Sequence, residues 1–432
     1  MFPKIGGSVI PKLAHHVRIA AIGAIAVAAL ALTACSGGQS LAVSGDANTV
    51  SGDLSANIDA AVESAMQLSG STEAVVGVWS EDGEYVRGFG DGIDGKTRFR
   101  GAQSTQPVVC ALLLDAVERG DVKLDDPVTK HLPRQSGIGD ITYAQLCEMR
   151  SGLADYKSSY ADIFVNNPTR PWPEQELIAE GLAHSPKSKP GTDFLQSDTN
   201  TVLLGRALSV EAAQSLPSLL SERVFSQAGM PSSYYPAYSA TEVNGDALQE
   251  LTYPSAAGAP VCDAGVTELT DVSANMLAGA GATVTTVTDL KSFYEHYLAG
   301  DFGDKKLVND DQPTVNPERD GEGNPTNEPE DNGVHWSFGM EKVGPLYGRA
   351  GAITGTISAA YHDPASGYTV VVALNNSSAG ASFARSLAFE LAAISTAAGS
   401  GPELSWSADD QAANLTAGAV CQGAPAEEAP AE

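Results

Sequence analysis

The chain has 432 residues, 43% of them hydrophobic, so it is long enough for one large or two ordinary globular domains with a real core. Its 53 acidic side chains outnumber 25 basic ones and give a formal net charge of −28. Such a surface repels nucleic acid, which excludes a nucleic-acid-binding function.

The first 34 residues have the pattern of an export signal. Three basic side chains precede an apolar run at 19–32, which is too short to span a bilayer comfortably. The run ends in the letters LTAC, which are similar to the lipobox of bacterial lipoproteins, whose cysteine becomes lipidated. We therefore expect lipidation of Cys35, a Ser/Gly-rich tether over 35–52, and a protein held by lipid on the extracytoplasmic face of the cell membrane.

The folded part begins with a helix and a hairpin. Apolar residues recur at helical spacing over 53–68, which predicts the helix. Two strand-like runs, 74–80 and 84–89, flank Asp82-Gly83, a strong hairpin signal. A terminal helix followed by an antiparallel hairpin is typical of an α+β fold.

Helices dominate the next two hundred residues. Residues 108–119 are mostly apolar and end at Gly120, so this helix should be buried on all sides. Shorter helical patterns cover 142–149 with Thr142 as cap, 199–208, 216–225, and 286–298, which opens on the capping-box pattern Thr286 to Asp289.

The last third returns to strands. Residues 309–332 are Pro, Gly, Asn and acids, which predicts a mobile acidic surface insert. The β-rich runs 351–361 and 368–374 follow it, and then a helix at 382–394. Strands at both ends of the chain predict one sheet closed by the two termini. We expect the domain to cover 53–396 and to be followed by a C-terminal tail, 397–432.

If Cys35 carries lipid, four cysteines remain, and outside the cytoplasm an even number indicates disulfides. Spacing alone leaves three pairings open. We favour Cys110 with Cys147 and Cys262 with Cys421, because the first two fall in adjacent helical segments. No zinc spacing, phosphate loop or nucleotide fingerprint is present, so we expect no metal and no cofactor.

Several short phrases, in order and at the right spacing, resemble the serine β-lactamase and D-Ala-D-Ala carboxypeptidase superfamily, in particular its class C and esterase-like branch. The phrases are Thr97-Arg98-Phe99-Arg100, Leu124-Asp125-Asp126-Pro127, Ser151-Gly152-Leu153 with Asp155-Tyr156, Pro190-Gly191-Thr192, Leu203-Leu204-Gly205, and Tyr347-Gly348 with Gly351 and Gly355. The resemblance implies an antiparallel sheet flanked by helices, with an all-helical region inserted between the early hairpin and the last strands.

The same resemblance implies an active site built on three motifs. A Ser at a helix N-terminus attacks a carbonyl after a Lys one turn later helps to remove its proton. A Tyr-x-Asn loop supplies proton transfer, and a Lys- or His-Thr-Gly strand binds the substrate carboxylate.

This sequence departs from the pattern at all three motifs. The nucleophile and lysine positions fall on Gln103 and Gln106, and a carboxamide is neither a nucleophile nor a base. The Tyr-x-Asn positions fall on Gln196 and Asp198. The cation of the third motif is Arg349, which cannot act as an acid or base near neutral pH.

Ser104 is the alternative nucleophile. It lies one residue on, about 100° around the helix, and Pro107 stands where its lysine would be. We favour an ordinary N-cap or first-turn serine instead.

The altered motifs predict a lipid-anchored envelope protein that has lost catalysis and acts in binding or scaffolding. One hypothesis pairs Asp198 with Arg349 across the old cleft. Another gives Arg349, Asp198 and Gln196 a ligand, such as the carboxylate of a peptidoglycan peptide. An envelope protein recruited by the acidic insert is a further candidate partner. The alternative is an active serine hydrolase, a carboxypeptidase, β-lactamase or esterase, that uses Ser104.

Overall fold

The computed structural model describes residues 45–422. The expected export signal, the lipidation site Cys35, most of the tether and residues 423–432 lie outside the described residues. Within 45–422, no helix combines the length and apolar character needed to cross a bilayer.

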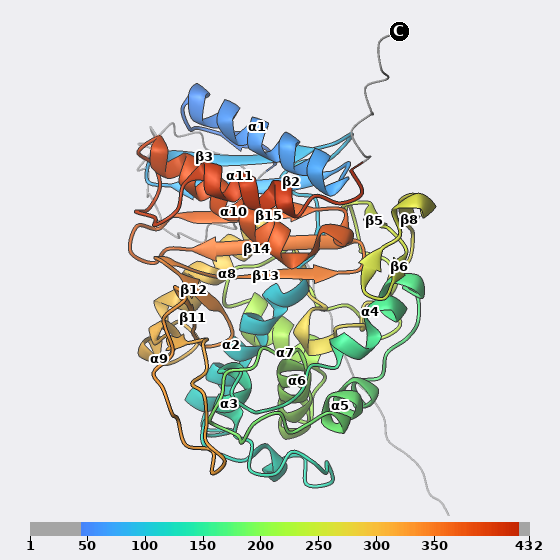
Figure 1. The fold of residues 1–432 in the computed structure, drawn as a ribbon, viewed down its shortest axis with the longest axis vertical. Coiled ribbons are helices and arrows are strands. Elements are labelled where there is room, and N and C mark those ends of the chain that lie inside the picture. Colours follow the sequence, from blue (N-terminus) through green and yellow to red (C-terminus); the bar gives the residue numbers. More distant parts are fainter. Residues whose placement is uncertain (1–44, 423–432) are drawn as a thin grey trace, which may run out of the picture. The chain divides into compact units, whose positions relative to one another are not determined.

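A single antiparallel sheet organises the described part of the chain (Figure 1). Its nine strands lie in the order β1, β3, β2, β15, β14, β13, β12, β11, β10. They are β1 (Ala47–Asn48), β2 (Ala74–Ser80), β3 (Gly83–Phe89), β10 (Gln312–Pro313), β11 (Val334–Trp336), β12 (Glu341–Val343), β13 (Leu346–Ile353), β14 (Thr356–His362) and β15 (Thr369–Leu374). Because β2 pairs with β15 along its length, the early hairpin and the last strand close one sheet, as predicted.

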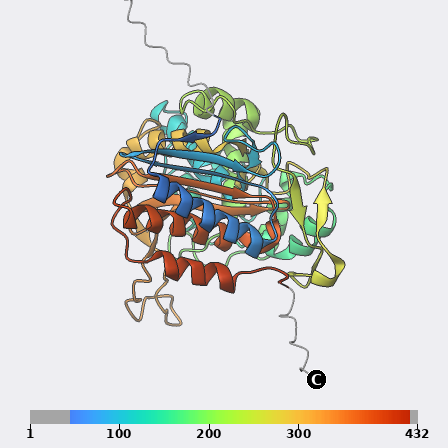
Figure 2. The ribbon, with the colours of Figure 1, turned by 90° about the horizontal axis from the view of Figure 1, so that it is seen from above.

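One face of the sheet is covered by helices from both ends of the chain. These are α1 (Gly52–Ser69), α10 (Gly380–Ala397) and α11 (Ala408–Ala417), which lie on the same side in Figure 2. Alternate residues of the central strands, such as Val76 and Val370, pack with Leu387 in the core of this layer. Their neighbours, such as Val75 and Val371, point into the core on the opposite face, so both faces are buried.

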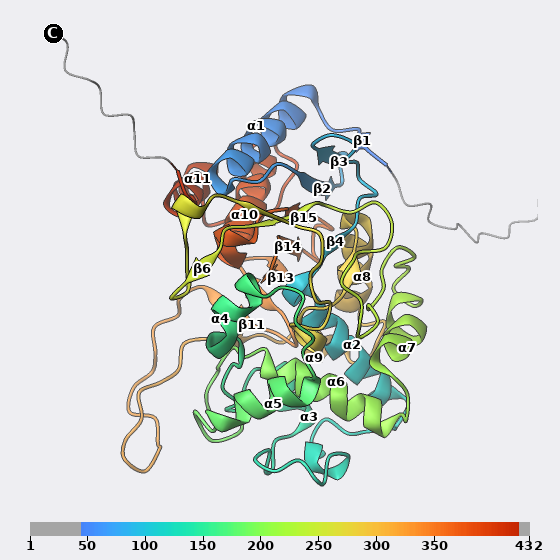
Figure 3. The same cartoon turned by 90° about the vertical axis from the view of Figure 1, so that its right-hand side faces the viewer.

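The opposite face carries the helical region (Figure 3). Its helices are α2 (Thr105–Glu118), α3 (Tyr143–Cys147), α4 (Lys157–Asn166), α5 (Glu174–Ala183), α6 (Thr199–Glu211), α7 (Leu216–Leu220), α8 (Val287–Ala299) and α9 (Lys305–Asn309). Helix α2 is buried on nearly all sides, as its apolar sequence predicts. Three short ladders join the loops: β4 (Phe99–Arg100) with β9 (Val284–Thr285), β5 (Glu250–Thr252) with β8 (Thr267–Leu269), and β6 (Ser255–Ala256) with β7 (Ala259–Pro260).

Some boundaries differ from the sequence-based expectations. The run 351–361 is two antiparallel strands, because Gly355 at φ +96° reverses the chain between β13 and β14. The helix expected at 216–225 ends as a π-helical turn, Ser221–Phe225. At 286–289 only half of the capping box forms, since the Asp289 carboxylate accepts hydrogen bonds from Ser232 and Ser233 instead.

The tether and the tail are shorter than expected. Asp46 accepts hydrogen bonds from the Gly88 and Gly95 amides, and β1 extends the sheet, so residues 45–52 belong to the fold. Within the expected tail 397–432, residues Ala408–Ala417 form the helix α11, which packs on α10. The sequence of α11 has a Ser407 to Asp410 capping box, a signal that was available.

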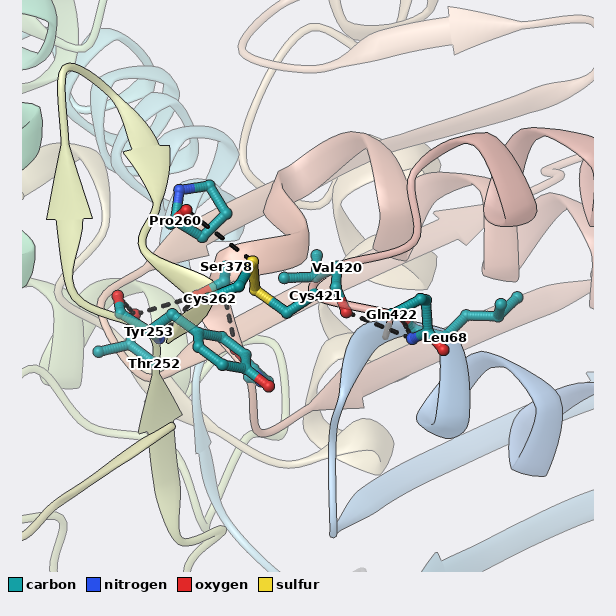
Figure 4. The surroundings of a disulfide bond; sticks show 10 residues. Leu68, Thr252, Tyr253, Pro260, Cys262, Ser378, Val420, Cys421 and Gln422 are labelled. Atoms are coloured by element: carbon teal, nitrogen blue, oxygen red, sulfur yellow. Dashed lines mark hydrogen bonds between the residues drawn. A yellow bond between two sulfur atoms is a disulfide. The ribbon is translucent and has the colours of Figure 1, made fainter. Parts of the chain in front are cut away.

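Both favoured disulfides form. Cys110 and Cys147 join α2 to the end of α3 in the core, where neither side chain is exposed. The exposed Cys262 pairs with Cys421 and ties the segment after α11 to the loop beyond β7 (Figure 4).

The acidic insert 309–332 is held at defined points. Its start supplies β10 at the edge of the sheet. Further along, Arg319 forms an ion pair with Asp193, and the Asn316 amide exchanges two hydrogen bonds with the Phe194 backbone. The insert therefore packs against the loop that leads into the second altered motif.

Candidate functional site

The first altered motif opens α2. The 3₁₀ turn Ala102–Ser104 precedes the helix, and Ala102 has φ +46°, a conformation that non-glycine residues rarely adopt. Gln103 is 3% exposed and Gln106, three residues on, is fully buried, and both contact Asp198.

The two carboxamides converge on one carboxylate. The Gln103 Nε2 donates to Asp198 Oδ2 and the Gln106 Nε2 donates to Asp198 Oδ1, each at 2.8 Å. Asp198 stands at the N-terminus of α6 and is 3% exposed, and Lys157 Nζ lies 3.9 Å from its Oδ2. A buried carboxylate is thus satisfied mainly by neutral donors.

Arg349 completes the network from β13. Its Nε donates to Gln106 Oε1 at 3.0 Å, and its guanidinium lies 5.0 Å from the centre of the Trp336 ring. With its carboxamide oxygen turned toward the guanidinium, Gln196 accepts from both Nη atoms, Nη1 at 2.9 Å. The predicted direct pair between Asp198 and Arg349 is wrong, because the Gln106 carboxamide bridges the two charges.

Gln103 makes a further contact that bears on catalysis. Its Oε1 accepts a hydrogen bond from the Ala352 backbone amide at 2.8 Å. Gly351 permits this approach, since a Cβ there would lie 2.4 Å from the Gln103 nitrogen and 2.7 Å from Oε1. A backbone N–H fixed beside a nucleophile is the kind of donor that stabilises an oxyanion. In this chain the Gln103 carboxamide already occupies that donor.

Ser104 has none of the surroundings of a nucleophile. It stands at the N-cap of α2, as predicted, yet its side chain makes no capping hydrogen bond and is 1% exposed. Its Oγ has no hydrogen-bond partner among residues 45–422. The nearby Tyr294 phenol is no base at neutral pH, because burial raises its pKa well above the usual value.

A pocket of about 330 Å³ opens beside Gln103, and we call it the charged pocket. Its lining residues are Gln103, Asp155, Lys157, Gln196, Asp198, Glu341, Arg349, Ala350, Ala381, Ser382 and Arg385. Three acids and three bases are among them, and Ser104 is not. The network therefore leaves room for a small molecule while it keeps Ser104 away from that molecule.

The charges on this pocket are unevenly paired. Glu341 accepts from the Tyr361 hydroxyl and lies 3.6 Å from Arg385 Nε. Asp155 forms no ion pair within the described part of the chain, and its Oδ1 accepts from the Lys157 amide. Burial, and then the neighbouring Asp198 carboxylate, raise the pKa of Asp155 to about 7.

The structure thus brings together five of the six candidate residues and leaves out Ser104. Sequence reasoning missed Asp155, Lys157, Glu341 and Arg385. In the sequence analysis Asp155 served only as part of a spacing pattern. Its place two residues after Ser151-Gly152-Leu153, just before a helix, was a signal that could have marked it as a site residue. The others come from elements that the sequence motifs do not mark.

Residues 58–393 of the chain match the model of the Beta-lactamase family. Among solved structures, the chain is similar to a D-stereospecific amidohydrolase from Streptomyces sp. at 22% identity and a TM-score of 0.63, over 74% of this chain and 94% of that one. It is similar to the D-amino acid amidase of Ochrobactrum anthropi SV3 complexed with D-phenylalanine, at 22% identity and a TM-score of 0.62, over 75% and 92%. A penicillin binding protein from Bacillus halodurans matches at 18% identity and 0.58, over 75% and 97%. At 18 to 22% sequence identity, these structural matches show that the chain shares their fold.

Proposed function

This chain belongs to the beta-lactamase family, and we propose that it is a member that has exchanged acyl transfer for ligand binding at the cell envelope. The observation that carries the proposal is the carboxamide of Gln103, which stands at the nucleophile position and accepts from the Ala352 amide. Acyl transfer then lacks an attacking hydroxyl, a proton acceptor and a free amide donor at once.

Binding is supported by what remains around the altered motifs. The charged pocket is open beside Gln103, and the guanidinium of Arg349 lines it without forming an ion pair with any carboxylate of residues 45–422. A buried cation without a counter-ion favours an anionic ligand. We propose a ligand with a terminal carboxylate, such as a peptidoglycan peptide, bound by a protein that is anchored through lipid on Cys35.

A covalent labelling experiment tests the loss of catalysis. The purified chain is incubated with a fluorescent penicillin and with a fluorophosphonate probe, beside an active penicillin-binding protein as positive control. We expect no labelled band from this chain. Covalent labelling that disappears in Ser104→Ala, or in Ser382→Ala as the other serine near the pocket, would contradict the proposal.

A binding experiment tests the role of Arg349. Titration with a muropeptide should give saturable binding that is lost in Arg349→Ala, with circular dichroism to verify that the variant is folded. Arg385→Ala is the matched control, since Arg385 lies on the same pocket, 30% exposed and beside Glu341. Muropeptide binding that survives Arg349→Ala removes the assigned role of this residue.

A further inference from the structure

A second pocket, of about 160 Å³, adjoins the charged pocket. The two share Lys157, and β13 runs from Ala350 in the first to Ala352 in the second. We call it the apolar pocket, because most of its wall is hydrocarbon. It is lined by Lys157, Ala161, Phe164, Val165, Met276, Leu277, Ala352, Ile353, Thr354 and Ser377.

The size of the apolar pocket restricts what can fill it. An apolar protein cavity of about 150 Å³ accommodates a benzene ring. A phenyl or leucyl side chain therefore matches this volume, whereas a methyl group would leave most of it empty. The pocket offers few polar partners, since the Thr354 hydroxyl already donates to the Phe164 carbonyl.

The charges of the adjoining pocket define the rest of the ligand. Asp155, in the segment before α4, provides a carboxylate that forms no ion pair in the described residues, since the Lys157 ammonium on the same pocket lies 3.9 Å from Asp198 Oδ2 instead. Arg349, on β13, provides a buried guanidinium whose hydrogen-bond partners, Gln106 and Gln196, are neutral amides. A molecule that carries both an ammonium and a carboxylate would neutralise both groups.

We propose that the two pockets together bind a zwitterionic amino acid or short peptide with a large apolar side chain. Its side chain lies in the apolar pocket, its ammonium faces Asp155 and its carboxylate faces Arg349. This assignment rests on the proposed function, because it names the ligand class of the same site. Among ligands with a terminal carboxylate, it favours one with a large apolar side chain over one that ends in alanine, whose methyl group leaves the apolar pocket largely unfilled.

Calorimetric titration of the full chain tests each part of the ligand. The probes are phenylalanine in both enantiomers, alanine, N-acetylphenylalanine and phenylalaninamide. One enantiomer of phenylalanine should bind at least about tenfold more tightly than alanine, because only phenylalanine buries a ring. Blocking the amine or the carboxylate should each cost about tenfold or more, since each removes one charge pair.

Two variants locate the side chain. Ala161→Trp, at an exposed position on the rim of the apolar pocket, should abolish the preference for phenylalanine over alanine. Ile163→Trp is the matched control, because Ile163 lies on the same helix, is 43% exposed and does not line the pocket.

Three results would overturn the assignment: equal affinity for alanine and phenylalanine, a preference that survives Ala161→Trp, or no binding of any probe at millimolar concentration. None of these three binding results bears on the loss of catalysis, which the penicillin and fluorophosphonate labelling tests separately. A covalently labelled chain that still prefers phenylalanine would refute the loss of catalysis and keep the ligand class.

Discussion

Gln106 separates two charges that would otherwise meet. Its amide nitrogen donates to Asp198 and its amide oxygen accepts from Arg349, both inside the protein. A lysine at this position would place a second cation beside Arg349. The carboxamide is the side chain that can serve an anion and a cation at once, because it carries a donor and an acceptor on one plane.

Replacing Gln106 by leucine should therefore destabilise the fold. The change leaves Asp198 and Arg349 each without one hydrogen bond in a buried setting, and bonds to charged groups contribute about 1.5 to 3 kcal/mol each. We expect the free energy of unfolding to fall by about 3 kcal/mol, measured by urea denaturation. Gln67→Leu on the exposed surface of α1 is the control and should change stability by less than about 0.5 kcal/mol. Equal stability of the two variants would mean that the bridge contributes nothing.

Asp155 makes ligand affinity depend on pH. Its pKa is raised to about 7 by burial and by Asp198, so it loses its charge as the pH falls from 8 to 6. The other charged groups on the pocket are Asp198, Lys157, Glu341, Arg349 and Arg385. Affinity for phenylalanine should weaken by up to about tenfold at pH 6, because a neutral carboxyl no longer attracts the ammonium. In Asp155→Asn the affinity should be low and flat over this range, and an unchanged slope in that variant would assign the effect to another group.

Sequence reasoning located the site residues better than their contacts. Spacing from Gly120 and from Pro190-Gly191 was enough to align Gln103, Gln106 and Asp198 with the motifs. It could not give the direction of each side chain, which depends on rotamers and on the approach of β13 through Gly351. The expected pair of Asp198 and Arg349 failed for this reason: opposite charges suggested a direct bond, and a neutral side chain stood between them.

At the level of elements, the helix α11 and the disulfide Cys262–Cys421 hold the C-terminal segment. The Val420 amide donates to the Leu68 carbonyl at the end of α1, and Cys421 forms its disulfide with Cys262, so the segment after α11 is attached at two neighbouring points (Figure 4). Cys262 is exposed, whereas Cys110 and Cys147 are both buried. A reductant therefore reaches the two bonds at different rates.

Mild reduction of the native protein should open Cys262–Cys421 first. Alkylation and peptide mass spectrometry should find modified Cys262 and Cys421 while Cys110 and Cys147 remain unmodified. Proteolysis within 398–420 should then accelerate, because α11 has lost one attachment. Simultaneous alkylation of all four cysteines would indicate that reduction requires global unfolding.

The elements that were predicted correctly have local signals. Of the missed elements, α4 and β10 depend on tertiary contacts, whereas α11 has a local capping-box signal. Helix α1 and the hairpin of β2 and β3 follow from apolar periodicity and from Asp82-Gly83. Helix α4 has one buried residue, Phe164, and so presents almost no apolar periodicity. Strand β10 is two exposed residues of the insert, and only its pairing with β11 makes it a strand.

Across the whole molecule, the excess of acidic groups and a few buried carboxyls both make the folded state less stable as the pH rises from about 5 to 8. Burial raises the pKa of Glu390, on α10, to about 7, with Asp409 of α11 adding to the effect, and burial raises that of Asp289 to about 6. In the folded state these carboxyls keep their protons at a pH where the unfolded chain has lost them. Between about pH 4.5 and pH 7, lowering the pH therefore favours folding, and above pH 7 the penalty of the buried charge is fully present.

The melting temperature should accordingly rise as the pH is lowered from 8 to 5. The net charge of −28 adds to this rise, because protonation relieves self-repulsion. Below about pH 4 the trend should reverse, since Asp126, Asp162 and Asp311 have lowered pKa values and lose hydrogen bonds or ion pairs when protonated. Differential scanning calorimetry at several pH values measures the curve.

Glu390→Gln separates the buried group from the general repulsion. The substitution removes a carboxylate whose Oε2 has no hydrogen-bond partner within residues 45–422, so at pH 8 we expect a melting temperature higher by roughly 2 to 4 °C. At pH 5 the difference should vanish, because Glu390 is then protonated in the folded protein. Glu63 is exposed on α1, and Glu63→Gln removes the same charge from the surface. This control variant should show only the small, pH-independent part of the rise in melting temperature. If both variants gain equally at pH 8, the slope of the curve reflects net charge alone and the buried carboxyl contributes nothing to it.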